Sequence, residues 1–254
     1  MEQLRQLYRR WSGSLPHTTE PLAGAGSNRK YYRMAAADGT AVIGCVGTNA
    51  EENHAFVTLA RHFSRLGLNV PQVLAVDNDE MRYLQTDLGT LSLFGAVAEG
   101  RSRGGQYSEE ERRLLAMTIS ELPRMQFEGA RGLDFACCFP QQEFDLQNVM
   151  FDLNYFKYCF LKPWGAEFNE VSLEHDFRRL ANLLLQVESN AFMYRDFQAR
   201  NVMLVQPQPS SPNPQPSSLN PHPSSPNPHP SSPIPQPYFI DFQGGRRGPC
   251  HYDV

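Results

Sequence analysis

The hydrophobic positions in the first third of the chain follow two different periods. Residues 29–36 and 40–46 alternate or run apolar as paired strands do, and Asp38-Gly39 supplies a hairpin turn between them. From Glu51 to Leu66 the apolar residues recur every three to four positions, which predicts a helix that Gly67 ends. Two further strands are predicted at 73–76 and 81–86.

Beyond residue 88 the pattern becomes mainly helical. Ser108 and Glu111 have the spacing of a capping box, which predicts the start of a helix that runs to Phe127. Residues 144–161 and 172–187 are two more amphipathic runs, and the aromatic stripe of the first is expected to lie in the core. We therefore expect an α+β fold, with an antiparallel sheet and a helix first and a mainly helical part second.

Short apolar runs flank two polar clusters near the end of the chain. Residues 191–193 and 202–205 enclose the segment that holds Asp196 and Asn201, and residues 238–240 precede Asp241. The runs are typical of short buried strands, which would deliver the three polar residues to one edge. Asp196 and Asn201 have the Asp-x-x-x-x-Asn spacing of a kinase catalytic loop, and Asp241 begins a second segment suited to metal binding.

These residue types suit phosphoryl transfer, in which positioning and charge neutralisation do most of the catalysis. Mg²⁺ binds through one or two protein oxygens plus the nucleotide phosphates, so Asn201 and Asp241 are the predicted metal ligands. Asp196 is the predicted catalytic residue, because its carboxylate can accept the hydrogen of an acceptor hydroxyl. An ordinary surface turn is the alternative, but a turn gives no reason for three polar groups to converge.

The chain resembles the aminoglycoside phosphotransferase and choline kinase superfamily, whose fold is protein-kinase-like. The resemblance rests on the two motifs and on three further segments, at residues 24–33, 84–89 and 248–254. Within the superfamily it is most similar to bacterial kinases that phosphorylate N-acetylmuramic acid and N-acetylglucosamine at the anomeric hydroxyl. The resemblance implies two lobes, a nucleotide-binding lobe at 1–87 and a catalytic lobe at 88–254.

The resemblance also implies the binding residues. ATP and Mg²⁺ are the expected cofactors, and the acceptor is a small molecule with a hydroxyl group. Backbone groups of Gln85, Thr86 and Asp87 are expected to hold the adenine, with Val42 and other apolar residues over its faces. The remaining expected contacts to ATP are Ser27, Asn28, Arg29 and Lys30. Tyr194, Arg195 and Asp253 are the expected structural supports of the catalytic loop.

One departure concerns the lysine that protein kinases place on the third strand, because residues 40–47 contain none. The cation near the phosphates is then expected to be Lys30, Arg29 or Arg33, or to come from elsewhere. A missing strand lysine is also a property of pseudokinases, so a non-catalytic nucleotide-binding protein is one alternative function. An aminoglycoside-modifying phosphotransferase is another, although no Asp- and Glu-rich cluster for a polycation accompanies the motifs.

A proline-rich stretch separates the two motifs. Residues 206–237 hold four copies of a seven-residue unit and no charged residue, so we expect a disordered insert in the loop between two strands. Loop closure becomes only slowly costlier with length, so the site can still assemble. A proline-rich ligand for a peptide-recognition module is the functional alternative.

Composition restricts the other expectations. With 254 residues, 41% hydrophobic, the chain can bury a full core, and a net charge of −4 gives no general attraction for nucleic acid or a membrane surface. No secretory or spanning apolar segment is present, so a cytoplasmic location is expected. The five cysteines have no zinc spacing and are expected to be reduced. Because chains of the superfamily continue past residues 252–254, we expect an incomplete catalytic lobe with exposed apolar surface.

Overall fold

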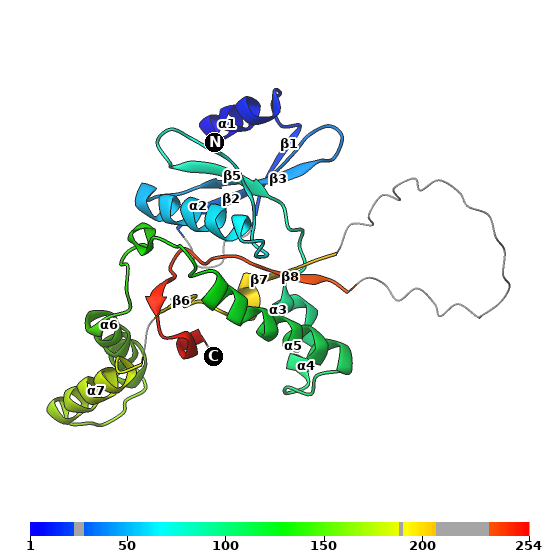
Figure 1. Cartoon of the computed structure of the whole chain (residues 1–254). Helices are drawn as coiled ribbons and strands as arrows, with labels where there is room; N and C mark the ends of the chain where they lie inside the picture. Colours follow the sequence, from blue (N-terminus) through cyan, green and yellow to red (C-terminus); the bar gives the residue numbers. More distant parts are fainter. Residues whose placement is uncertain (23–27, 188–189, 207–233, 254) are drawn as a thin grey trace, which may run out of the picture.

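The N-terminal part of the chain is a five-stranded antiparallel sheet (Figure 1). The computed structural model describes residues 1–22, 28–187, 190–206 and 234–253. The strands lie in the order β1-β2-β3-β5-β4, and they are β1 Thr18–Pro21, β2 Lys30–Ala35, β3 Ala41–Val46, β4 Val73–Val76 and β5 Arg82–Thr86. The four predicted strands are confirmed to within one residue at each end, whereas β1 was not predicted.

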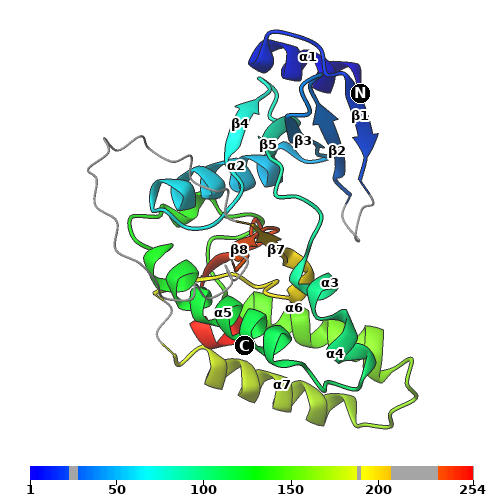
Figure 2. The ribbon, with the colours of Figure 1, turned by 90° about the vertical axis from the view of Figure 1, so that its right-hand side faces the viewer.

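Two helices cover opposite faces of this sheet, α1 (Glu2–Ser12) and α2 (Ala50–Arg65) (Figures 1 and 2). The predicted helix at 51–66 is thus confirmed, and the Asn49 side chain caps it by accepting a hydrogen bond from Glu52 N at 3.0 Å. One core cluster joins α1 to one sheet face through Leu4, Leu7, Tyr8, Met34, Val42 and Leu84. The main core joins α2 to the other face and continues into the C-terminal part.

The C-terminal part is mainly helical and lies beyond α2, on the side away from α1 (Figure 2). Its helices are α3 Leu93–Ala96, α4 Ala98–Ser102, α5 Glu109–Pro123, α6 Leu146–Phe156 and α7 Glu170–Leu184. The capping box is confirmed, because Glu111 N donates to Ser108 Oγ at 3.2 Å and Ser108 N donates to Glu111 Oε2 at 2.8 Å. The α+β fold class is therefore confirmed. In the four described stretches, no helix has the length and apolar character needed to cross a membrane.

Two short antiparallel strand pairs carry the predicted motifs. β6 (Ala191–Met193) pairs with β9 (Arg246–Gly248), and β7 (Val202–Val205) pairs with β8 (Gln236–Phe239). The proline-rich insert predicted at 206–237 joins β7 to β8, but residues 207–233 lie outside the described residues. Its predicted end was wrong, because Gln236 and Pro237 pair with Val205 and Leu204 as part of the β7–β8 ladder.

The aromatic stripe of α6 and the π-helical segment that continues it, Lys157–Leu161, does not lie in the core. Phe156 is 44% exposed and Phe160 is 52% exposed, so the prediction that this stripe is buried was wrong. Phe156 stacks on Phe160 with ring centroids 5.3 Å apart, and Phe160 stacks on Trp164 at 6.0 Å. Helical spacing makes the stripe continuous, but no other layer of the described chain covers it.

Candidate active site

The catalytic-loop motif spans the turn between β6 and β7. Met193 ends β6, a 3₁₀ turn at Ala199–Asn201 follows Asp196, and Val202 begins β7. β8 runs antiparallel to β7, with Phe239 opposite Val202, so the residues after β8 return beside the residues before β7. Ile240 N donates to the carbonyl oxygen of Asn201 at 3.0 Å, which fixes the second motif against the first.

Three predicted site residues meet at this junction. Asn201 Nδ2 donates to the carbonyl oxygen of Asp196 at 2.9 Å and lies 3.4 Å from Asp241 Oδ2. Gln243 Nε2 donates to the other oxygen of Asp241 at 2.6 Å. Asn201 therefore links the loop of Asp196 to the carboxylate of Asp241. In the sequence, Asp196 and Asp241 lie on opposite sides of the proline-rich stretch.

The predicted supports of the loop lie directly behind it. Asp253 accepts hydrogen bonds from Tyr194 N at 2.9 Å and from Arg195 N at 2.6 Å. Gln126 Nε2 donates to the same carboxylate at 2.8 Å. The Tyr194 hydroxyl donates to the carbonyl oxygen of Ile240. Asp253 and Tyr194 thus attach both motifs to the helical part of the chain.

Two motif residues have left-handed backbone conformations that side chains rarely adopt. Arg195 has φ 78° and Asp241 has φ 66°. The Arg195 guanidinium donates to Asp152 Oδ1 at 3.0 Å, and the Tyr252 hydroxyl contacts the other oxygen of Asp152 at 3.2 Å. Such conformations persist only where surrounding contacts hold them, and they cluster at functional sites.

The electrostatic environment favours the protonated form of two carboxyl groups. Partial burial raises the pKa of Asp196, and the nearby charge of Asp241 raises it further, although the Asp196 side chain still reaches solvent. Burial also raises the pKa of Asp253, against the opposing effect of the hydrogen bonds that it accepts from Gln126, Tyr194 and Arg195. A carboxylate with a raised pKa is a stronger proton acceptor, which is what a general base needs.

A cavity of about 300 Å³ lies between the sheet and the two motifs. Gln85, Thr86 and Asp87 line it together with Asn201 and Asp241. Its apolar lining is Leu22, Ile43, Phe56, Leu88, Met203 and Ile240. Val42, which was expected to cover the adenine, does not line this cavity, because successive residues of β3 face opposite sides of the sheet. Val42 packs against α1, and Ile43 lines the cavity.

Arg33 and Asp87 close one side of this cavity. Arg33 Nε contacts Asp87 Oδ2 at 2.5 Å, and its Nη2 donates to Asp87 Oδ1 and to the carbonyl oxygen of Gly89, each at 3.0 Å. The hydrogen bond to Asp87 is the largest influence that raises the pKa of Arg33. The guanidinium therefore joins β2 to the segment that connects the sheet to the helical part.

Of the remaining predicted contacts to ATP, Asn28, Arg29 and Lys30 are not among the residues that line the cavity. Asn28 and Lys30 are exposed, and Ser27 lies outside the described residues. The Arg29 side chain is 1% exposed, and its Nη2 contacts Glu52 Oε1 and donates to the Glu52 carbonyl oxygen, each at 3.1 Å. Burial lowers the pKa of Arg29, but Tyr83, Tyr31 and Glu52 raise it above its ordinary value overall.

Sequence reasoning missed several residues that contact the predicted ones, among them Gln126, Glu52 and Gln243. Glu52 lies in the first turn of α2, and only the tertiary structure shows that it meets Arg29, which precedes β2. Gln243 follows Asp241 by two positions, so its place in the second motif was a local signal for its contact with that carboxylate. Asp152, on α6, accepts a hydrogen bond from Arg195 Nη2 at 3.0 Å.

No protein-family model matches the chain. The N-acetylmuramate/N-acetylglucosamine kinase of Pseudomonas aeruginosa is 23% identical over 248 residues, which are 96% of this chain and 60% of that protein. The enzyme of the same name from Neisseria meningitidis serogroup B is 25% identical over 231 residues, 89% of this chain and 56% of that protein. The chain thus spans little more than half the length of these relatives.

A solved structure, the aminoglycoside-3′-phosphotransferase of type VIII, aligns with 100% of this chain and 81% of its own, at 13% identity and a TM-score of 0.49. The two curated relatives bear the same name as the bacterial sugar kinases that the motifs indicated. Over nearly its whole length, the chain is therefore similar to N-acetylmuramate/N-acetylglucosamine kinases, and the resemblance predicted from the sequence is confirmed.

Proposed function

We propose that the chain carries the phosphoryl-transfer site of an ATP-dependent kinase that acts on a hydroxyl group of a sugar or amino sugar. The observation that supports this most directly is the contact of Asn201 with both Asp196 and Asp241 beside the 300 Å³ cavity. The names of the two curated relatives support the reaction and the acceptor class. In this proposal residues 1–87 form the nucleotide-binding lobe and residues 88–254 the catalytic lobe.

The cavity suits the base of ATP, because apolar side chains of both parts line it and the 85–87 segment borders it. The triphosphate would then extend from the cavity toward Asn201 and Asp241, which line its far side. The chemistry of these donors fits Mg²⁺, since both offer hard oxygen atoms. Asn201 Nδ2 is used by the Asp196 carbonyl oxygen, which leaves the Asn201 amide oxygen for the ion. When bound, Mg²⁺ neutralises phosphate charge.

Asp196 is the proposed general base. Its carboxylate accepts the hydrogen bond of the acceptor hydroxyl and takes the proton as the oxygen attacks the γ-phosphorus atom. The bond between the γ-phosphorus and the oxygen that bridges it to the β-phosphorus breaks, and ADP leaves. The raised pKa of Asp196 increases its basicity, and its exposure to solvent leaves an entrance for the acceptor. Asn201 and Asp253 hold the backbone of the loop that carries this carboxylate.

Arg29 is the proposed replacement for the lysine that residues 40–47 lack. Its ion pair with Glu52 joins the segment before β2 to α2, whereas the lysine of the corresponding pair in protein kinases lies on the third strand. The pair also lies against the cavity wall, because the Arg29 guanidinium stacks 5.9 Å from the ring centre of Phe56, which lines the cavity. This arrangement favours a catalytic function over a non-catalytic one.

The proposal is tested with the purified chain, ATP, Mg²⁺ and a panel of sugars, amino sugars and aminoglycosides. We expect phosphorylation of a sugar or amino sugar, and a decrease of about 10²- to 10⁴-fold in turnover for Asp196→Asn. ATP binding, measured by calorimetry, should remain nearly unchanged in this variant.

A matched control is Asp176→Asn, since Asp176 lies on α7, outside both motifs, and forms no ion pair with another described residue. Equal turnover of Asp196→Asn and the wild type would refute the proposed base. Phosphorylation of aminoglycosides alone would transfer the acceptor assignment to that class. Magnesium-dependent ATP binding without any transfer would assign a nucleotide-binding protein instead.

A further inference from the structure

Two arginine side chains from different segments contact the ring of Phe94, which lies on α3. The central carbon of the Arg101 guanidinium, on α4, lies 3.3 Å from the ring centre, and that of Arg200, on the 3₁₀ turn Ala199–Asn201, lies 4.2 Å from it. Both distances start at the same centre, so the two cations cannot be farther apart than these distances together. A cation–π contact attracts the charge of a guanidinium but gives its N–H groups no hydrogen-bond acceptor.

Neither cation of this arginine pair, Arg101 and Arg200, has a charged partner. Among the residues that the structure describes, the two side chains form no ion pair and no hydrogen bond, and Arg101 Nε is buried without an acceptor. The carboxylates of Glu99 and Glu111 contact Arg103 instead, at 3.0 Å and 3.5 Å. Because two like charges beside one ring repel each other, an oxyanion that accepts hydrogen bonds from both would be bound favourably.

Backbone contacts fix the aromatic ring relative to Arg200. Ser92 Oγ caps α3 by accepting a hydrogen bond from Gly95 N at 3.1 Å. Leu204 N donates to the carbonyl oxygen of Leu91 at 2.8 Å, which attaches the start of α3 to β7. α3 also packs against the 3₁₀ turn that carries Arg200 (Figure 2). A site whose groups are already in position loses less conformational freedom when it binds a ligand.

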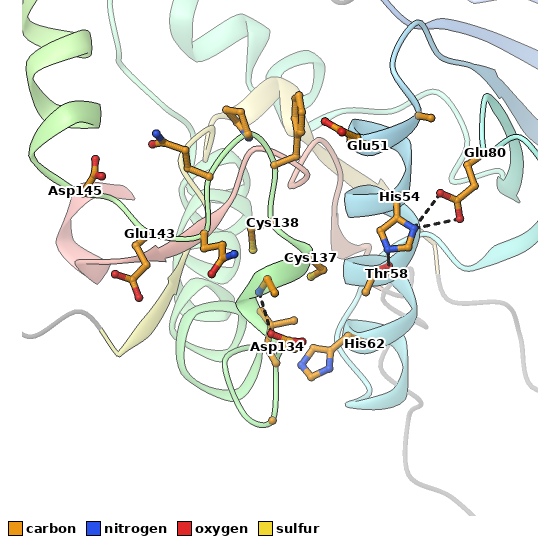
Figure 3. Close-up of a pocket in the computed structure, with 18 of the residues that line it drawn as sticks. Glu51, His54, Thr58, His62, Glu80, Asp134, Cys137, Cys138, Glu143 and Asp145 are labelled. Atoms are coloured by element: carbon orange, nitrogen blue, oxygen red, sulfur yellow. Dashed lines mark hydrogen bonds and ion pairs between the residues drawn. The ribbon is translucent and has the colours of Figure 1, made fainter.

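The arginine pair borders the proposed nucleotide cavity, because the exposed Arg200 lines it. The other charged residues of the lining are Arg33, Asp87 and Asp241. Arg33 and Asp87 neutralise each other, and Asp241 belongs to the proposed metal site. Arg200 therefore supplies positive charge that would attract an anionic group at the mouth of this cavity. Neither arginine of the pair lines the larger pocket, of about 1160 Å³, between α2 and residues 132–145 (Figure 3).

We propose that Arg101 and Arg200 form a binding site for one oxyanion, a carboxylate or a phosphate group, separate from the place of the ATP triphosphate. Each guanidinium can donate two parallel hydrogen bonds to such a group, and the Phe94 ring holds both guanidiniums near one point. Two sources offer this chemistry. One is an anionic group on the acceptor, an assignment that rests on the proposed function, and the other is free phosphate. The binding of the oxyanion itself does not require phosphoryl transfer.

The test measures binding by calorimetry at low salt, with D-glucuronate as the anionic probe and D-glucose as the neutral one. The two probes differ only at C6, which is a carboxylate in the first and a hydroxymethyl group in the second. We expect glucuronate to bind at least about tenfold tighter than glucose, because charge-assisted hydrogen bonds to arginine are strong. Added salt should reduce this preference, since it screens charges that are exposed to solvent.

Arginine variants separate the site from the general charge of the chain. Arg101→Gln and Arg200→Gln should each lower the affinity for glucuronate about tenfold and leave the affinity for glucose unchanged. Arg103→Gln is the matched control, because Arg103 is close in sequence but is paired with Glu99. Equal glucuronate affinity of Arg200→Gln and the wild type, or an equal loss in Arg103→Gln, would overturn the proposal. If thermal melting shows that Arg101→Gln does not fold, Arg200→Gln, at an exposed position, decides the question.

Competition experiments identify the source of the oxyanion. Displacement of glucuronate by inorganic phosphate at a similar concentration would assign the site to the free ion, and weak displacement would assign it to a group on a small molecule. Displacement by an ATP analogue that cannot be hydrolysed would place the triphosphate at the arginine pair and overturn a separate site. Binding of glucuronate that depends on the pair, in a chain that does not bind the analogue, would refute the proposed function and support this inference.

Discussion

The Arg29 guanidinium contacts the Glu52 carboxylate at 3.1 Å, which joins the residue before β2 to the first turn of α2. The arginine side chain is 1% exposed and the glutamate side chain is 30% exposed, so the pair lies at the edge of the core. Removing one partner of such a pair leaves a charge with poor solvation. The pair is therefore a sensitive point for both stability and the proposed nucleotide site.

Glu52→Gln should lower the free energy of unfolding by roughly 1–3 kcal/mol, because the buried guanidinium loses its charged acceptor. It should also lower kcat/KM for ATP if Arg29 serves the phosphates. Glu51→Gln is the control, since Glu51 is exposed in the same turn and lines the separate pocket shown in Figure 3, not the proposed nucleotide cavity. Denaturant unfolding and ATP kinetics measure the two effects. Equal behaviour of the two variants would contradict the assigned contribution of the pair.

Asp196→Asn should make the folded chain more stable at pH 7. Burial and Asp241 raise the folded-state pKa of Asp196 above the unfolded value of about 4, so its contribution to stability is full below that value. The contribution is lost as pH rises through the folded-state pKa. We expect a gain of at most about 1 kcal/mol at pH 7, because the group still contacts solvent, and none at pH 3. Thermal melting at both values checks the sign.

Asp253→Ala should reduce turnover strongly, because Tyr194 N and Arg195 N lose their shared acceptor and the loop of Asp196 loses its position. The free energy of unfolding should fall by about 1–3 kcal/mol for each buried N–H left without a partner. Tyr252→Phe, which loses only a 3.2 Å contact to Asp152, is the control. Turnover is measured with saturating ATP, and the free energy of unfolding is measured with denaturant. Equal turnover of the two variants would contradict the assigned contribution of Asp253 to the position of the loop.

Ile43→Trp and Val42→Ala should separate nucleotide binding from packing. The larger side chain at position 43 should fill much of the 300 Å³ cavity and weaken ATP binding at least about tenfold. Val42→Ala should leave ATP binding unchanged and lower the free energy of unfolding by roughly 1–3 kcal/mol, because Val42 is buried against α1. Calorimetry measures ATP binding, and denaturant unfolding measures stability. Weakened ATP binding by Val42→Ala together with unchanged binding by Ile43→Trp would contradict the assignment.

The sequence by itself determined those features whose signals are local. The helix at 51–66 follows from apolar spacing, the start of α5 follows from the Ser108 capping box, and the strands around Asp196 and Asp241 follow from short apolar runs. Because the β7–β8 pair returns the chain on itself, two strands and two motifs were enough to predict that the three polar residues meet.

Only the tertiary structure decided which face of each helix or strand packs against another element, lines a cavity or remains exposed. The two-residue period of a strand shows that successive residues of β3 face opposite sides of the sheet. The packing of α1 decides that Val42 lies in the core and that Ile43 lines the cavity. Helical periodicity likewise gives α6 and its continuation an aromatic stripe, yet Phe156 and Phe160 remain exposed because no described segment packs over them. The Arg29–Glu52 pair and the raised pKa of Asp196 likewise depend on contacts between distant segments, which local sequence patterns do not encode.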